Sequence, residues 1–193
     1  MLYKVSRFIF AVSIKLFIKI RVKGKENFLK KEPFILVSNH ARNLEPVLLG
    51  IACPRKIAFL AKEELFRLPV VGGWFGGVGC VPIRRKDSDI LALKQSLRIL
   101  RRKNPIVIFP QGARGSKEVK PGVGFLVKKS GVPVIPARIY GSDKVLPPGK
   151  MVPKRARVRI VVGRPLQIEG HKSPEIISSE VFNAIEALGQ EKG

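Results

Sequence analysis

The sequence predicts a single α/β domain in which a central mixed sheet is flanked by helices. Short apolar runs bounded by Pro, Gly or Asn read as strands, and they alternate with segments whose apolar residues repeat at helical spacing. The chain has 193 residues, the size of one ordinary domain that can bury a core without disulfides or metals. It contains no internal repeat and no low-complexity tract.

Residues 2–20 predict an amphipathic helix ahead of this domain. On a helical projection, basic residues fall within an arc of roughly 120° and apolar residues cover most of the remainder. The basic residues are Lys4, Arg7, Lys15 and Lys19. Four charges argue against a membrane-spanning segment, and no small-residue cleavage site follows. We therefore expect a membrane-anchoring helix over 1–20 and the domain over 21–193; the alternative is a helix packed on its own domain.

The first elements of the domain are predicted from apolar runs and their boundaries. A basic, Gly-containing connector over 21–31 leads into a short buried strand over 33–38. A helix is expected over 45–53, because a carboxylate is favoured at a helix start and Pro is tolerated in the first turn. A second strand over 56–60 and a short helix over 62–66 follow.

The middle of the chain contains a glycine-rich stretch over 70–79 that has no phosphate-binding fingerprint. We expect a flexible turn there, which packs closely or borders a lipid pocket and ends at residues 80–83. Asp87 or Ser88 should cap the next helix, whose leucines repeat at helical spacing and whose last turn is basic.

The last elements begin with residues 106–109, the clearest buried strand of the chain. A short helix over 122–130 and an extended apolar segment over 132–139 are predicted next. Residues 157–162 alternate polar and apolar side chains, which indicates an edge strand. A final helix opens at Ser173-Pro174.

Composition points to an anionic partner. Lys and Arg outnumber Asp and Glu by 37 to 14, a formal charge of +23. Nucleic acid is disfavoured, because the few aromatic residues are mostly Phe within apolar runs and do not alternate with basic residues. An anionic membrane is favoured. Cys53 and Cys80 lie in apolar surroundings without metal-ligand spacing, so we expect buried thiols.

Three predicted loops carry polar groups, and each follows an apolar run: 40–45, 84–85 and 111–114. Loops held by rigid strands are common places for sites. An imidazole, a carboxylate and two arginine clusters are suited to a base that acts beside a bound phosphate. Any one of these arginines could equally be a solvated surface group.

Taken in order, four motifs resemble those of glycerolipid acyltransferases, the family typified by 1-acyl-glycerol-3-phosphate (lysophosphatidate) acyltransferases. In the family, the first motif is a His followed, after four intervening residues, by Asp, and the third is Phe-Pro-Glu-Gly-Thr-Arg. The counterparts here are His40 to Glu45, Val81 to Arg85, Phe109 to Arg114 and Val132 to Pro136. The resemblance runs from about residue 21 to residue 166.

The resemblance implies a role for each motif. His40 would be the general base and Glu45 would hold the other imidazole N–H. The second and third motifs would bind the acceptor phosphate and the fourth would lie on the acyl-donor side. The phosphate-binding residues would be Arg84, Arg85, Gln111, Gly112 and Arg114, and the donor-side residues Val132, Pro133 and Pro136. No metal and no bound cofactor are implied.

The expected reaction moves a fatty acyl group from acyl-CoA or acyl-carrier protein to the free hydroxyl of a lysophospholipid, with 1-acyl-glycerol-3-phosphate as the leading acceptor. Membrane phospholipid is an expected partner, and nucleic acid is not. We expect the protein to attach to the cytoplasmic face of the cell membrane as a peripheral or monotopic protein. The chain departs from the family pattern at Glu45, Gln111 and Ala113. Another lysolipid, a lipid A-type acceptor or a non-catalytic membrane-binding relative therefore remain alternatives.

Overall fold

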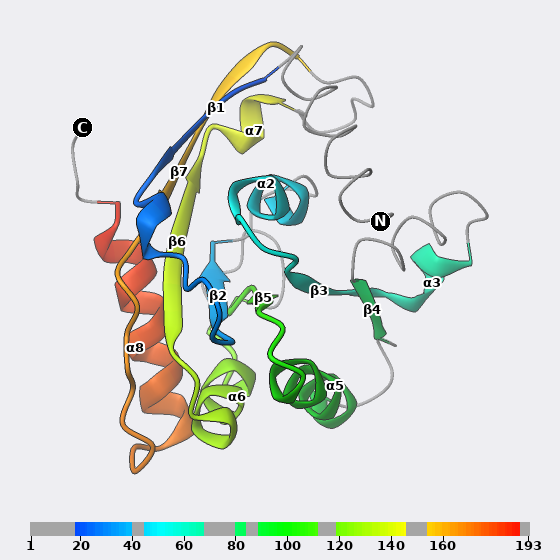
Figure 1. Cartoon of the computed structure of the whole chain (residues 1–193), viewed down its shortest axis with the longest axis vertical. Coiled ribbons are helices and arrows are strands. Elements are labelled where there is room, and N and C mark those ends of the chain that lie inside the picture. The colour runs from blue at the N-terminus through cyan, green and yellow to red at the C-terminus, as the bar shows by residue number, and fades with distance from the viewer. Residues whose placement is uncertain are drawn as a thin grey trace.

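The centre of the protein is a seven-stranded mixed sheet with the order β1-β7-β6-β2-β5-β3-β4 (Figure 1). The computed structural model describes residues 18–39, 45–67, 80–83, 89–111, 119–145 and 154–189. The strands are β1 (Ile18–Lys23), β2 (Ile35–Ser38), β3 (Ala58–Lys62), β4 (Cys80–Ile83), β5 (Ile106–Ile108), β6 (Val134–Tyr140) and β7 (Ala156–Val162). The predicted α/β class with a mixed sheet is confirmed.

Five neighbouring strands of the sheet run in the same direction. β2 pairs in parallel with both β5 and β6, and β3 pairs in parallel with both β5 and β4. β7 is antiparallel to β6, and β1 is parallel to β7, so these two strands run the opposite way. The carboxyl ends of β6, β2, β5, β3 and β4 therefore share one edge of the sheet, which we call the carboxyl edge.

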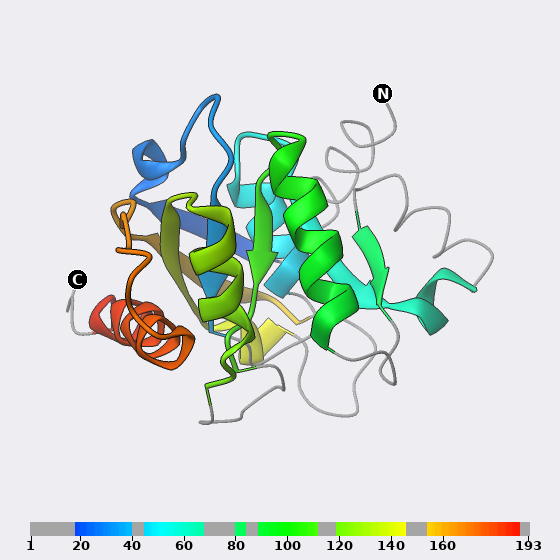
Figure 2. The same cartoon turned by 90° about the horizontal axis from the view of Figure 1, so that it is seen from below.

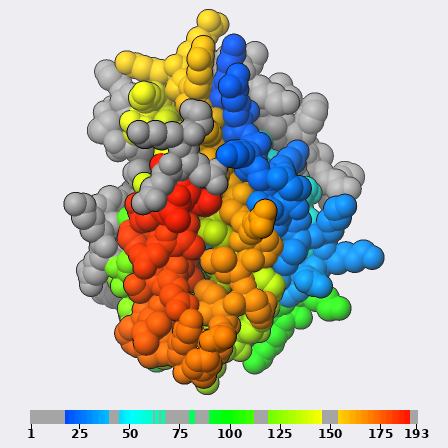
Figure 3. Space-filling model, turned by 90° about the vertical axis from the view of Figure 1, so that its left-hand side faces the viewer, coloured from blue at the N-terminus to red at the C-terminus, as the bar shows by residue number. Residues whose placement is uncertain are grey.

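Helices cover both faces of the sheet. They are α2 (Glu45–Ala52), α3 (Glu63–Phe66), α5 (Asp89–Arg101), α6 (Gly122–Ser130), α7 (Ser142–Val145) and α8 (Pro174–Ala187), with a short 3-10 helix, η1, over Lys25–Asn27. α5, α6 and α8 lie on one face and α2 lies on the other (Figures 1 and 2). Figure 3 shows α8 lying lengthwise along one side of the molecule, beside the segment that follows β7.

The core forms two apolar clusters because successive residues of a strand point to opposite faces. In β2, Ile35 and Val37 join the cluster that faces α6 and α8, whereas Leu36 joins the cluster that contains Leu48 and Leu49 of α2. All five side chains are fully buried. Burial of each such side chain contributes about 1.5–3 kcal/mol, so β2 is held firmly from both faces.

The structure corrects the prediction for the start of the chain. Residues 18–20, expected to end a helix, and residues 21–23, expected in a connector, together form β1. Their burial alternates with a period of two, as Ile18 is buried and Lys19 exposed, and pairing with β7 satisfies their backbone groups. Residues 1–17, the rest of the predicted membrane helix, lie outside the described residues.

Two further strand predictions are corrected. β7 was expected at an edge but lies between β1 and β6. The alternation of polar and apolar residues in β7 does not come from an edge position. It arises because Val158 and Ile160 enter the core while Arg157 and Arg159 face solvent. Residues 80–83, expected only to end a turn, form β4 at the other edge of the sheet. The glycine-rich stretch over 70–79 lies outside the described residues.

Candidate active site

The three polar loops predicted from the sequence all begin at the carboxyl edge. The first loop leaves β2 after Ser38, the third leaves β5 after Ile108, and the second leaves β4 after Ile83. β5 adjoins β2, and β4 lies two strands further on. Neighbouring strands are about 4.8 Å apart, so the starting points of the loops span roughly 15 Å. In parallel sheets this edge is the usual place for a ligand site.

Five of the seven site residues predicted in those loops lie outside the described residues. These are His40, Arg84, Arg85, Gly112 and Arg114. Two are described: Gln111 is partly buried just beyond β5, and Glu45 is the first residue of α2. The predicted helix start at Glu45 is confirmed.

The fourth motif, Val132 to Pro136, begins at the edge of the sheet opposite the polar loops. The carbonyl of Pro133 accepts a hydrogen bond of 3.0 Å from the backbone N–H of Ile35, so this residue lies where β6 and β2 begin. Val132 and Pro133 therefore lie at the edge opposite the polar loops. Pro136 lies within β6 beside Val37, closer to the carboxyl edge. The described part of this motif holds β2 against β6, and it is not brought together with Glu45.

The carboxylate of Glu45 is fully buried, and hydrogen-bond donors beside it offset the cost of that burial. Its Oε1 atom accepts a hydrogen bond of 2.8 Å from Oγ of Ser142, the first residue of α7. Ser142 is itself 3% exposed. The start of α2 adds the favourable field of backbone N–H groups at a helix N-terminus. A carboxylate without water needs such donors, because burying an unpaired charge is costly.

Gly141 makes the turn that brings Ser142 to this position. Its φ is +77°, which L side chains rarely adopt, and a Cβ atom there would clash with the carbonyl oxygen of Arg157 on β7. Only glycine at position 141 therefore allows the turn from β6 into α7 to lie this close to β7. Sequence analysis assigned no role to Gly141 or Ser142, although a Gly-Ser-Asp run after an apolar strand is typical of a turn.

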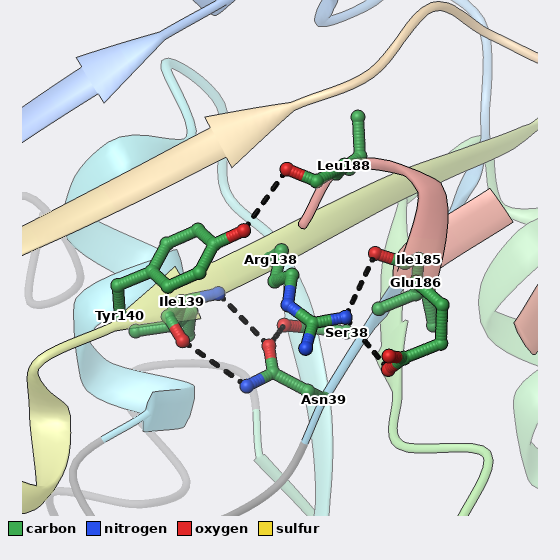
Figure 4. A network of polar contacts seen from close by, with 8 residues as sticks. All are labelled: Ser38, Asn39, Arg138, Ile139, Tyr140, Ile185, Glu186 and Leu188. Carbon is green, nitrogen blue, oxygen red and sulfur yellow. Dashed lines mark hydrogen bonds and ion pairs between the residues drawn. The ribbon is translucent and has the colours of Figure 1, made fainter. Parts of the chain in front are cut away.

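Asn39 is a second residue that sequence reasoning left without a role. Its Nδ2 donates to the carbonyl of Ile139 at 3.1 Å, and its Oδ1 accepts from the N–H of Ile139 at 2.8 Å (Figure 4). Ser38 Oγ donates to the same Oδ1 at 3.3 Å. The amide thus continues the pairing of β2 with β6 by one residue and fixes the backbone immediately before His40.

The carboxyl half of β6 is held in turn by α8 (Figure 4). Arg138 makes an ion pair of 2.6 Å with Glu186 and donates to the carbonyl of Ile185 at 3.3 Å. The hydroxyl of Tyr140 donates to the carbonyl of Leu188 at 2.9 Å. A cation and a donor at a helix C-terminus complement the unpaired carbonyls there. The strand that holds Asn39 is therefore itself anchored.

A small cavity of about 130 Å³ lies between α5 and α6 beside the end of β5. Its walls are mostly apolar and include Leu60, Ala92, Leu93, Ile108, Phe109 and Pro110. Lys120 also lines it and is exposed. Because Phe109 and Pro110 lead into the third polar loop, this apolar space adjoins the carboxyl edge.

A larger hollow of about 610 Å³ runs along the outer surface of α5. Its lining combines basic and apolar side chains: Leu91, Lys94, Gln95, Leu97, Arg98, Arg101 and Arg102. Within the described ranges, no helix is both long enough and apolar enough to cross a bilayer. No group of three or more His, Cys, Asp or Glu side chains suited to a metal ion occurs in that part of the chain.

Both cysteines are thiols rather than a disulfide, and Cys53 is fully buried. Burial raises the pKa of Cys80 from 9.0 to about 12. This thiol therefore stays protonated at neutral pH, which makes it a poor nucleophile although β4 leads to the carboxyl edge. The predicted burial is confirmed for Cys53, whereas Cys80 is only partly buried.

An α/β domain whose polar loops begin at the carboxyl edge of its sheet has the organisation of an α/β enzyme. Residues 19–140 match the model of the acyltransferase family, and the chain belongs to that family.

Curated relatives are similar over most of this chain. A chloroplastic 1-acyl-sn-glycerol-3-phosphate acyltransferase of Arabidopsis thaliana is 28% identical over 183 residues, covering 91% of this chain and 50% of the relative. The Bacillus subtilis enzyme of the same name is 26% identical over 150 residues, covering 76% and 73%. The chain thus spans about half the length of the chloroplastic relative.

A solved structure has the same fold. The crystal structure of the 1-acyl-sn-glycerophosphate acyltransferase PlsC from Thermotoga maritima superposes with a TM-score of 0.74 at 23% sequence identity. It covers 98% of this chain, and the match includes 83% of that protein. This likeness shows that the two proteins share a fold.

Proposed function

We propose that the protein is an O-acyltransferase that moves a fatty acyl group from a thioester to the free hydroxyl of a lysophospholipid. The preferred acceptor is 1-acyl-glycerol-3-phosphate, which becomes phosphatidic acid. The observation that carries the proposal is the buried carboxylate of Glu45 at the start of α2, just after the loop that contains His40. Family membership and the names of the relatives support the reaction class.

The chemistry requires one base and no covalent intermediate with the protein. The imidazole of His40 removes the proton of the acceptor hydroxyl as the oxygen attacks the thioester carbonyl. The tetrahedral intermediate then collapses, the C–S bond breaks, and the leaving sulfur takes the proton from the imidazolium. The carboxylate of Glu45 fixes the imidazole tautomer and stabilises the imidazolium, as the acid does in a catalytic triad.

The acceptor phosphate is proposed to bind between the second and third loops. Guanidinium groups donate paired hydrogen bonds to phosphate oxygens, a role that suits Arg84, Arg85 and Arg114. Gly112 allows close approach of the backbone. Gln111 stands where the family has Glu, so it can donate and accept hydrogen bonds but carries no charge.

The apolar cavity beside β5 is proposed to take part of an acyl chain. Its walls match the chemistry of methylene groups, and its position next to Phe109 and Pro110 places it near the third loop. The donor, acyl-CoA or acyl-carrier protein, is proposed to approach on the side of the fourth motif. Of that motif, Pro136 lies nearer to the carboxyl edge than Val132 or Pro133.

Membrane attachment is proposed to be peripheral or monotopic, on the cytoplasmic face, through residues 1–17, the part of the predicted amphipathic segment that precedes β1. The formal charge of +23 favours an anionic lipid surface. The basic and apolar lining of the hollow on α5 is compatible with the same surface. Both features are suited to an enzyme whose acceptor is itself a membrane lipid.

The test is a panel of lysolipid acceptors given to the purified protein with acyl-CoA and, separately, with acyl-carrier protein. We expect transfer to 1-acyl-glycerol-3-phosphate. Arg114→Ala should raise the KM for this acceptor and leave the KM for the donor unchanged, because the lost guanidinium contacts only the phosphate. Absence of transfer to every acceptor by the parent protein would refute the proposal.

The departures at Gln111 and Ala113 favour one second candidate, an acyltransferase for another lysolipid or a lipid A-type acceptor. In that case the panel would show a preferred acceptor without glycerol phosphate, and Arg114→Ala would matter little. A non-catalytic membrane-binding relative would bind anionic vesicles and transfer to none of the acceptors.

A further inference from the structure

The loop that contains His40 is anchored at both of its ends by one short segment, Ile139 to Ser142. At the near end, the side-chain amide of Asn39 makes two hydrogen bonds with the backbone of Ile139. At the far end, the carboxylate of Glu45 accepts a hydrogen bond from Ser142. Only Tyr140 and Gly141 separate Ile139 from Ser142, so one short turn receives both contacts.

The contact between Ser142 and Glu45 has the properties of a positioning contact. The two residues are 97 positions apart in the chain, so local sequence does not bring them together. Both are almost completely buried, at 3% and 0% exposure. A buried hydroxyl that donates to a carboxylate forms a charge-assisted bond with a preferred direction, which restricts the rotamer of the carboxylate.

Glutamate at this position needs such a restriction. Its side chain has one more rotatable bond than aspartate and therefore more ways to point its oxygens. The hydroxyl of Ser142 fixes Oε1 at 2.8 Å. Gly141 in turn fixes Ser142, because its positive φ and its close approach to the Arg157 carbonyl define the turn out of β6.

We propose that Ser142 is a positioning residue of the active site: its hydroxyl orients the carboxylate of Glu45 so that this carboxylate holds the imidazole of His40. Ser142 itself touches no substrate. The inference rests on the proposed function, since it assumes that His40 is the base and Glu45 its partner. It adds a third residue, from a different part of the chain, to that pair.

The test compares Ser142→Ala with Ser142→Thr, which keeps the hydroxyl, and with Ser178→Ala. Ser178 is a matched control, because it is 2% exposed and its Oγ accepts a hydrogen bond of 3.0 Å from the N–H of Gly124, between α6 and α8. We expect Ser142→Ala to lower kcat about 10-fold to 100-fold with unchanged KM, the loss of one hydrogen bond to a charged group. Ser142→Thr should recover most of this loss, and Ser178→Ala should lower the Tm with kcat unchanged.

A second readout does not depend on activity. The chain has two histidines, His40 and His171, so NMR titration of the imidazoles can follow His40 once a His171→Asn variant has assigned the signals. We expect the pKa of His40 to fall in Ser142→Ala, because a carboxylate that is no longer held stabilises the imidazolium less well. It should be unchanged in Ser178→Ala.

The outcomes separate this inference from the proposed function. Equal kcat and an equal His40 pKa in Ser142→Ala and in an active parent would overturn the positioning role alone. A pKa that rises would also overturn it. If the parent shows no transfer, the proposed function fails, whereas a fall in the His40 pKa in Ser142→Ala would still show that Ser142 orients Glu45.

Discussion

The side chain of Asn39 pairs with the backbone of Ile139 as another peptide group would, with one donated and one accepted hydrogen bond. β2 is only four residues long, and this amide lengthens its attachment to β6 without further strand. The side chain of Asn39 thus extends the rigid attachment of β2 up to the residue before His40, the proposed base.

Asn39→Ala should reduce both stability and activity. Two hydrogen bonds are lost and the partly buried backbone of Ile139 loses its partners, so we expect the free energy of unfolding to fall by about 1–3 kcal/mol. Urea unfolding and kcat measure the two effects. Asn27→Ala is the control, because Asn27 Nδ2 donates to the carbonyl of Val162 at 2.9 Å, away from the carboxyl edge. Asn27→Ala should lose stability and keep kcat; equal kcat in both variants would contradict the account.

Glu45→Gln should reduce activity without reducing stability. The amide keeps the shape of the side chain and can accept the hydrogen bond from Ser142, but it has no charge to stabilise an imidazolium. We expect kcat to fall roughly 10,000-fold, in line with the loss of the acid's charge in catalytic triads. The free energy of unfolding should stay the same or rise, since burying a neutral amide costs less than burying a carboxylate.

Glu45→Asp is the companion variant, measured in the same two assays. It keeps the charge and shortens the reach to Ser142 by one methylene, so we expect partial activity between that of the parent and that of Glu45→Gln. A fully active Glu45→Gln variant would show that the carboxylate has no catalytic role.

Cys80→Ala should keep full activity, because the proposed transfer needs no thiol. With a pKa of about 12, roughly one thiol in ten thousand is ionised at pH 8, so native Cys80 should react very slowly with iodoacetamide. Since the unfolded thiol ionises near its ordinary value of 9.0, this residue makes the native state less stable as pH rises above 9. Mass spectrometry measures the labelling, and an acylated Cys80 trapped during turnover would contradict direct transfer.

Ala92→Leu should change the chain-length preference if the cavity beside β5 holds part of the acyl group. The added methylene groups fill a wall of a space of about 130 Å³. We expect the ratio of kcat/KM for long over short acyl donors to fall about tenfold, the usual effect of a few methylenes in an apolar pocket. Ala187→Leu, the same change at an exposed position of α8, should leave the ratio unchanged. An unchanged ratio in Ala92→Leu would exclude the cavity.

Much of the fold could be predicted because periodicity reports burial. β2 and β5 are apolar on both faces and lie in the centre of the sheet, and α8 begins where Ser173 and Pro174 predicted. β1 was missed because residues 18–23 alternate with a period of two at the end of a longer segment that also fits a helical period. Pairing with β7, which is more than 130 residues distant, decides between the two, and no local pattern reports it.

The candidate site could be predicted only in part, for a similar reason. His40 and Glu45 are visible as a spaced pair, and the start of α2 at Glu45 is confirmed. Ser142 and Asn39 act through contacts across about 100 residues, which residue order alone does not reveal. The parallel sheet brings these distant segments together.

The most direct test of the central claim is the initial rate of phosphatidic acid formation from 1-acyl-glycerol-3-phosphate and an acyl thioester, measured for the parent protein and for His40→Ala. The account predicts formation by the parent and a rate about 100-fold to 10,000-fold lower for the variant, the usual contribution of a general base. Equal rates for the two proteins would contradict it.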